Sequence, residues 1–117
     1  MTEDDREELK KLCEVIRETV PALQIYLFGS YAYGSPHRDS DYDFYVVIPD
    51  NGPRPLTAMQ DLSVALHKHC HKPLDIMVGK ESRFSCRAEE PTLERTVRQK
   101  GVLLYSESME PQPIMAQ

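Results

Sequence analysis

The sequence contains no tryptophan, only three cysteines and only five glycines among 117 residues. The cysteines, Cys13, Cys70 and Cys86, are an odd number without a Cys-x-x-Cys spacing, so no disulfide framework is predicted. No apolar run approaches the roughly 20 residues that a membrane-spanning helix requires. The N-terminus is charged from its third residue and has no apolar segment, so no secretory signal is predicted. We therefore expect a cytoplasmic protein with reduced thiols and no membrane partner.

Basic residues are also scarce relative to acidic ones. The chain has 14 Lys and Arg against 19 Asp and Glu, which gives a formal net charge of −5. Proteins that bind nucleic acid without sequence preference need a basic surface, so a nucleic-acid partner is disfavoured. The length suits one domain with a single core, and 40% hydrophobic residues are typical of a globular chain.

Hydrophobic periodicity predicts an alternation of helices and strands over residues 1–105. The expected helices cover residues 2–18, a segment from Thr57 to just before Pro73 with a Thr57-x-x-Gln60 capping box, and residues 92–100. Strands are expected over 23–28, 42–48, 74–78 and 102–105, and residues 82–88 are expected to be irregular. This order favours an α/β (α+β) layer fold. Residues 106–117 lack periodicity and contain two prolines, so they predict a mobile C-terminal tail.

The residues that carry chemistry are concentrated between positions 23 and 48. Gly29 directly follows the first predicted strand, where a glycine lets the backbone bend and lets a ligand approach bare N–H groups. Ser30 adds a hydroxyl group, and a helix that begins at Ser30 would offer its free N–H groups to an anion. The turn is therefore predicted to bind phosphate.

Acidic residues mark the two strands that follow. Asp41 and Asp43 have the same parity, so their Cα atoms are expected roughly 6 to 7 Å apart on one strand face. Two such acids repel unless a cation lies between them, and oxygen ligands suit Mg²⁺; the alternative is a turn with solvated acids. Asp75 lies within an apolar strand, where a carboxylate either pairs or points to solvent from an edge strand.

Together these motifs resemble a known signature. Gly29-Ser30, a gap of ten residues and Asp41-x-Asp43 before an apolar run are similar to the polymerase-beta-like nucleotidyltransferase superfamily. The runs 29–34 (GSYAYG) and 40–43 (SDYD) most resemble the minimal nucleotidyltransferase (MNT) branch, with its Gly-Ser-Tyr-Ala-Arg-Gly and Ser-Asp-x-Asp elements. The resemblance extends over residues 22–105. Tyr33 departs from it by replacing the usual arginine, and Arg38 or Lys80 is a candidate source of the missing positive charge.

The resemblance implies a fold and a site. It implies a nucleotidyltransferase domain over residues 1–105, with a small mixed sheet of about four strands and helices mainly on one face, similar to the polymerase-beta palm. It implies that three catalytic acids hold two Mg²⁺ ions, with Mn²⁺ as the alternative: Asp41, Asp43 and Asp75. It also implies that the phosphates of the nucleotide are bound by Gly29, Ser30 and Ser40.

The implied activity is Mg²⁺-dependent transfer of a nucleoside monophosphate, with AMP and ATP favoured, to a hydroxyl group. We expect no additional acceptor-binding domain, and the chain is acidic, so a protein acceptor fits best. Proteins that resemble it are often antitoxins paired with a HEPN-domain toxin, and some add AMP to a tyrosine of that toxin. The alternatives are a non-catalytic module that neutralises a partner by binding it, with Tyr33 marking the loss of catalysis, and a nucleotide sensor.

Overall fold

A computed structural model describes residues 3–29, 41–70 and 72–107 of the chain. Its elements, in chain order, are α1 (Glu3–Thr19), β1 (Gln24–Phe28), β2 (Tyr42–Ile48), α3 (Pro55–His67), β3 (Leu74–Lys80), α4 (Glu81–Arg87), α5 (Leu93–Lys100) and β4 (Val102–Ser106). The predicted positions Ser30, Tyr33, Arg38 and Ser40, and the tail from residue 108, lie outside the described residues.

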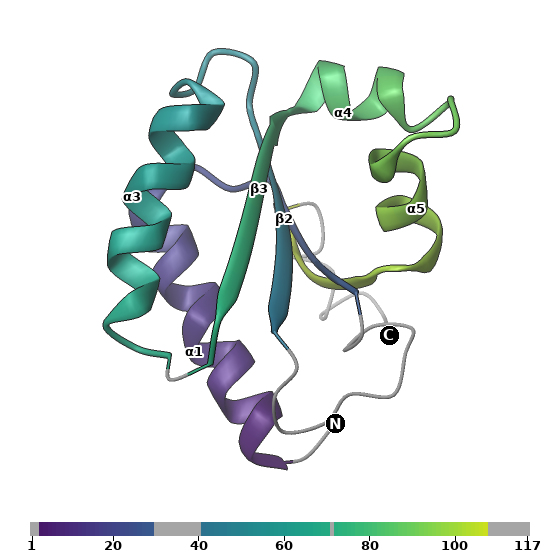
Figure 1. Ribbon diagram of the computed structural model, residues 1–117. Coiled ribbons are helices and arrows are strands. Elements are labelled where there is room, and N and C mark those ends of the chain that lie inside the picture. The colour runs from purple at the N-terminus through teal and green to yellow at the C-terminus, as the bar shows by residue number, and fades with distance from the viewer. Residues whose placement is uncertain (1–2, 30–40, 71, 108–117) are drawn as a thin grey trace, which may run out of the picture.

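The strands form one mixed sheet in the order β3-β2-β1-β4. The β2–β3 pair is parallel, whereas β1 pairs antiparallel with both β2 and β4. The two long helices, α1 and α3, lie on one face of the sheet, and the shorter α4 and α5 lie on the other (Figure 1). The predicted four-stranded mixed sheet is therefore confirmed. In the described ranges no helix is both long and apolar enough to span a membrane.

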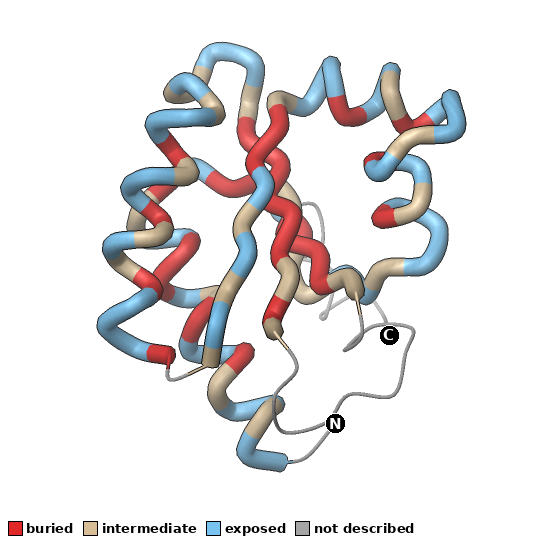
Figure 2. Tube along the Cα trace, in the orientation of Figure 1, coloured by how far each residue is buried: buried red, intermediate tan, exposed pale blue. Residues whose placement is uncertain are grey.

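The alternation of side chains along β2 explains both faces of the sheet. Every second residue from Tyr42 to Ile48 belongs to the main core, which α1 and α3 cover with Leu12, Ile16 and Leu62 among others. Figure 2 shows this core as buried residues along the sheet and on the sides of the two helices that face it. The intervening positions of β2 face α4 and α5, so their chemistry is separated from the main core.

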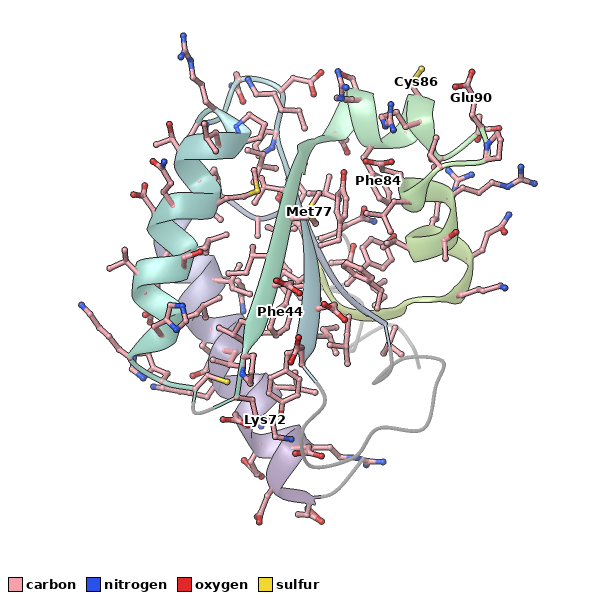
Figure 3. All side chains as sticks on the ribbon, in the orientation of Figure 1. Phe44, Lys72, Met77, Phe84, Cys86 and Glu90 are labelled. Atoms are coloured by element: carbon pink, nitrogen blue, oxygen red, sulfur yellow. The ribbon has the colours of Figure 1, made fainter. Side chains whose placement is uncertain are left out.

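A smaller apolar cluster lies on this second face and accounts for α4. Phe84 of α4 packs against Tyr26 and Tyr45, with ring centroids 5.6 and 5.2 Å apart, respectively (Figure 3). The expectation of an irregular segment over residues 82–88 is therefore wrong. A helix of two turns places few residues inward, and here Phe84 is its buried apolar anchor, so no apolar period could reveal it.

The bounds of α3 also differ from the expectation. The helix begins at Pro55, with Arg54 as an N-cap whose side chain makes no capping bond, so the predicted capping box at Thr57 is wrong. Proline is favoured at the first helical position because its missing N–H would have no intrahelical partner there. The helix ends at His67 and does not reach Cys70, whose Sγ instead donates to the backbone oxygen of Lys72 at 3.4 Å.

Candidate functional site

Register brings two of the predicted acids together. Asp43 of β2 pairs with Phe28 of β1 on one side and with Asp75 of β3 on the other, so the three residues form one row across the sheet. We call the two acids of this row, Asp43 and Asp75, the acidic row. The next row on the same face contains Tyr45 and Met77. Because α4 follows the C-terminal end of β3, the acidic row near the N-terminal ends of β2 and β3 lies away from that helix (Figure 1).

The neighbouring acids change the ionisation of Asp43. Partial burial, the neighbouring Asp75 carboxylate and a hydrogen bond with it, and the charge of Asp41 together raise the pKa of Asp43 to about 6. A hydrogen bond between two carboxyl groups requires a proton on one of them. No lysine or arginine contributes to this shift among the described residues. Below about pH 6 the Asp43 carboxyl therefore holds a proton, and at higher pH a cation at the same position would relieve the repulsion between the two carboxylates.

The position of Asp43 explains why residue 29 is a glycine. Its φ of 78° lies in the left-handed region, which side chains with a Cβ adopt rarely. A Cβ built on Gly29 would lie 3.0 Å from Cγ of Asp43 and would collide with its carboxylate oxygen. The glycine is thus needed because the Asp43 carboxyl approaches the backbone at this point. Its predicted role in binding phosphate remains a prediction.

The third acid, Asp41, precedes β2 and is half-buried. In the part of the chain that the structure describes, no three His, Cys, Asp or Glu side chains come close enough together to hold a metal ion. The structure thus brings Asp43 and Asp75 together without closing a three-carboxylate site. Asp75 is exposed on the edge strand β3, which is one of the two alternatives expected for it. Two adjacent carboxylates with no basic neighbour among the described residues still offer the oxygen ligands that Mg²⁺ prefers.

The suggestion that Lys80 supplies the missing positive charge is wrong. Lys80 pairs with Ile48 at the opposite end of β3 from Asp75, and its Nζ donates to the backbone oxygen of Asp50 at 2.9 Å. A separation of five residues along a strand places its Cα roughly 16 Å from that of Asp75.

One buried polar cluster was not predicted. The Tyr45 hydroxyl donates to Oε2 of Glu94 at 2.9 Å, and Nε of Arg87 donates to Oε1 at 3.0 Å. Burial works to raise the pKa of Glu94, but hydrogen bonds from its own backbone N–H, from Arg87 and from Tyr45 outweigh it, and the pKa is lowered. Glu94 lies in the first turn of α5, where an acid is ordinary, so the sequence carried no signal of this contact.

The cluster borders a pocket that we call the α4 pocket. It has a volume of about 280 Å³ and is lined by Tyr45, Pro55, Met77, Val78, Gly79, Arg83, Arg87 and Glu94. A Cβ on Gly79 would collide with the Tyr45 hydroxyl, so this glycine gives the tyrosine room to reach Glu94. The pocket thus lies on the same sheet face as the acidic row, toward the C-terminal end of β3.

Comparison with known proteins finds a matching family and a relative. The family described as "Polymerase beta, Nucleotidyltransferase" matches residues 10–110 of the chain. The protein adenylyltransferase MntA of Shewanella oneidensis is 49% identical over 41 residues, which are 34% of this chain and 30% of that relative. The chain thus aligns with less than a third of the length of MntA.

Solved structures share the fold at low sequence identity. A chain of a toxin–antitoxin crystal structure with AMP-PNP superimposes with a TM-score of 0.59 at 22% identity, covering 92% of this chain and 80% of that one. A chain of the complex between a tri-AMPylated Shewanella oneidensis HEPN toxin and an MNT antitoxin gives 0.59 at 19% identity, covering 92% and 77%. These similarities confirm a nucleotidyltransferase fold.

Proposed function

Because the chain belongs to the polymerase beta nucleotidyltransferase family, we propose that it transfers AMP from ATP to a hydroxyl group of a protein in a Mg²⁺-dependent reaction. The observation that carries the proposal is the acidic row. Asp43 and Asp75 are neighbours in register, lack a basic partner among the described residues and lie beside the Gly29 turn. A nucleotidyltransferase uses carboxylates in such an arrangement to hold the divalent cations that offset the charge of a triphosphate.

Each residue has a proposed role. Asp43 and Asp75, joined by Asp41, would hold Mg²⁺, with Mn²⁺ as the alternative ion. When bound, such ions offset phosphate charge and lower the pKa of an attacking hydroxyl. Gly29, with Ser30 and Ser40, would hold the β and γ phosphates through backbone N–H and hydroxyl groups. These roles concern the described acids directly, whereas the two serines lie outside the described residues.

At the α-phosphorus, the reaction makes one bond and breaks one. The acceptor oxygen forms a bond to the α-phosphorus, and the bond between that phosphorus and the oxygen bridging to the β-phosphorus breaks. Pyrophosphate leaves with the electron pair, and the hydroxyl proton passes to solvent. The chain contributes by placing the reacting groups in line, which removes much of the entropic barrier.

The proposed acceptor is a HEPN-domain protein. Support comes from MntA, which is a protein adenylyltransferase, and from the fold shared with a chain of the AMPylated HEPN–MNT complex. The net charge of −5 also fits a protein acceptor better than a nucleic acid.

The test uses labelled ATP, Mg²⁺ and the product of the neighbouring gene as acceptor. Wild-type protein should transfer label, and Asp43→Ala should lower the rate by roughly 100-fold or more, because lost ion binding removes several kcal/mol from transition-state stabilisation. Asp61→Ala is the matched control, since Asp61 is an exposed acid of α3 on the other side of the sheet. Absence of transfer by wild type to any partner would refute the proposal.

A second function, neutralisation of a partner by binding alone, is favoured by one residue. Tyr33 stands where the resembling family has arginine, so the chain lacks that positive charge. Under this alternative, Asp43→Ala should neutralise the partner as fully as wild type does. Partner inhibition is therefore measured beside label transfer in the same two proteins.

A further inference from the structure

We propose that the α4 pocket binds an acidic side chain of the acceptor polypeptide and thereby positions the acceptor hydroxyl at the acidic row. This inference rests on the proposed function. It assigns the pocket to the acceptor rather than to the nucleotide, and it identifies Arg83 as the residue that recognises the acid.

Hydrogen-bonding capacity in the pocket supports an anionic guest. Glu94 is satisfied, because Tyr45 and Arg87 each donate to one of its carboxylate oxygens. Arg87 uses its Nε for this bond, its terminal nitrogens make no hydrogen bond with a described residue, and its side chain is 42% exposed. Arg83 is exposed and has no hydrogen bond or ion pair with any residue in the described ranges. Arginine binds carboxylates through two parallel N–H groups, so these two side chains suit an acidic guest.

The balance of charge supports the same guest. Two arginines and one carboxylate leave the lining with one net positive charge, in a chain whose formal net charge is −5. Arg87 is already engaged by Glu94, and Arg83 is the charge left without a partner in the described part of the chain. One carboxylate from outside would therefore balance the pocket.

The residues of β3 that line the pocket give its distance from Asp75 and the proposed reaction site. Asp75, Met77 and Gly79 alternate onto the same sheet face, and the last two line the pocket. At about 3.3 Å per residue, the pocket lies roughly 7 to 13 Å from Asp75 along the strand. An extended acceptor covers that distance in two to four residues. Met77 is 40% exposed and offers an apolar surface between the two ends (Figure 3).

The geometry of in-line transfer indicates that the acceptor, rather than the nucleotide, lies on the side of this pocket. The attacking hydroxyl and the leaving pyrophosphate lie on opposite sides of the α-phosphorus. The pyrophosphate is proposed to lie at Gly29, which follows β1, and β1 and β3 flank β2 on opposite sides. The β3 side, where the pocket opens, is therefore the side from which the acceptor approaches.

The experiment measures peptide binding without nucleotide, so it does not depend on catalysis. The probes are three fluorescein-labelled peptides with one tyrosine and, three residues away, Glu, Gln or Lys. Wild-type protein should bind the Glu peptide about tenfold more tightly than the Gln peptide, and Arg83→Ala should remove that preference. Arg83→Glu should shift the preference to the Lys peptide. Arg95→Ala is the matched control, because Arg95 is an exposed arginine of α5 outside the pocket lining.

Two results would overturn the inference. Equal binding of the Glu and Gln peptides by wild type would do so even if the protein transfers label. A weaker affinity of Arg83→Ala for Mg²⁺–ATP in calorimetry would assign the pocket to the nucleotide instead. A preference for the Glu peptide that depends on Arg83 would support the pocket even if no label is transferred, so the two proposals fail separately.

Discussion

Replacing Asp43 by asparagine should stabilise the ligand-free protein at neutral pH and leave its stability at pH 4 almost unchanged. The pKa of Asp43 is raised from 3.8 to about 6 in the folded state, so the native protein binds this proton more tightly than the unfolded chain does. The contribution of this group to stability is therefore fully present below about pH 4 and is lost as pH rises through 6. Asparagine cannot ionise, so the variant should not show this fall.

The magnitude follows from the shift. One pKa unit corresponds to about 1.36 kcal/mol, so a shift of this size has an upper limit of about 3 kcal/mol. Because the Asp43 carboxyl is only partly buried, solvent screens the repulsion, and we expect about 1 kcal/mol at pH 7. For a domain of this length that difference raises Tm by about 4 °C.

Urea unfolding at intervals between pH 4 and pH 7.5 provides the measurement. Wild type, Asp43→Asn and the exposed-acid control Asp61→Asn are compared, so that the titration of other acids cancels in the differences. The control should parallel wild type throughout. If Asp43→Asn also parallels wild type between pH 4 and 6, the two carboxyls do not interact as the structure places them.

Three further predictions follow from the same contacts. Mg²⁺ at millimolar concentration should raise the Tm of wild type at pH 7.5 and leave Asp43→Asn unchanged in thermal unfolding; an equal rise in both would exclude the acidic row as the ion site. Gly29→Val should cost on the order of 3 kcal/mol in urea unfolding, because left-handed strain adds to the collision with Asp43, whereas a loss under 1 kcal/mol would mean that the turn relaxes freely. Tyr45→Phe and Glu94→Gln should each cost about 1 to 2 kcal/mol and should couple by at least about 0.5 kcal/mol in a double-mutant cycle; strictly additive losses would contradict their hydrogen bond.

Local pattern predicted the elements that have strong periodicity. Strand β2 matches its predicted bounds of 42–48, because its apolar residues form a continuous buried run that ends at a proline. The first helix, predicted over 2–18, covers Glu3–Thr19 among the described residues, so its C-terminal end differs from the prediction by one residue. Both segments have many apolar positions, so the loss of any one of them would not hide the pattern.

The local sequence pattern could not predict elements and contacts that depend on long-range pairing. Strand order and register make Asp75 the neighbour of Asp43, and the two residues are 32 positions apart in the chain. The resemblance to a known family supplied that pairing in advance, whereas periodicity could not. The bond between Tyr45 and Glu94 depends on α5 and on the missing Cβ of Gly79, and none of these signals is local.

The acidic row and the α4 pocket together distinguish the functions considered. A protein that only binds its partner gains nothing from two adjacent carboxylates that destabilise its fold at neutral pH, unless a cation relieves them. A nucleotide sensor would use such a cation, but it would have no use for the acceptor subsite proposed on the β3 side. Only transfer to a protein requires both features on one sheet face, within reach of an extended segment of a few residues. Stabilisation by Mg²⁺ through Asp43, combined with Arg83-dependent binding of an acidic peptide, would therefore favour transfer over both alternatives.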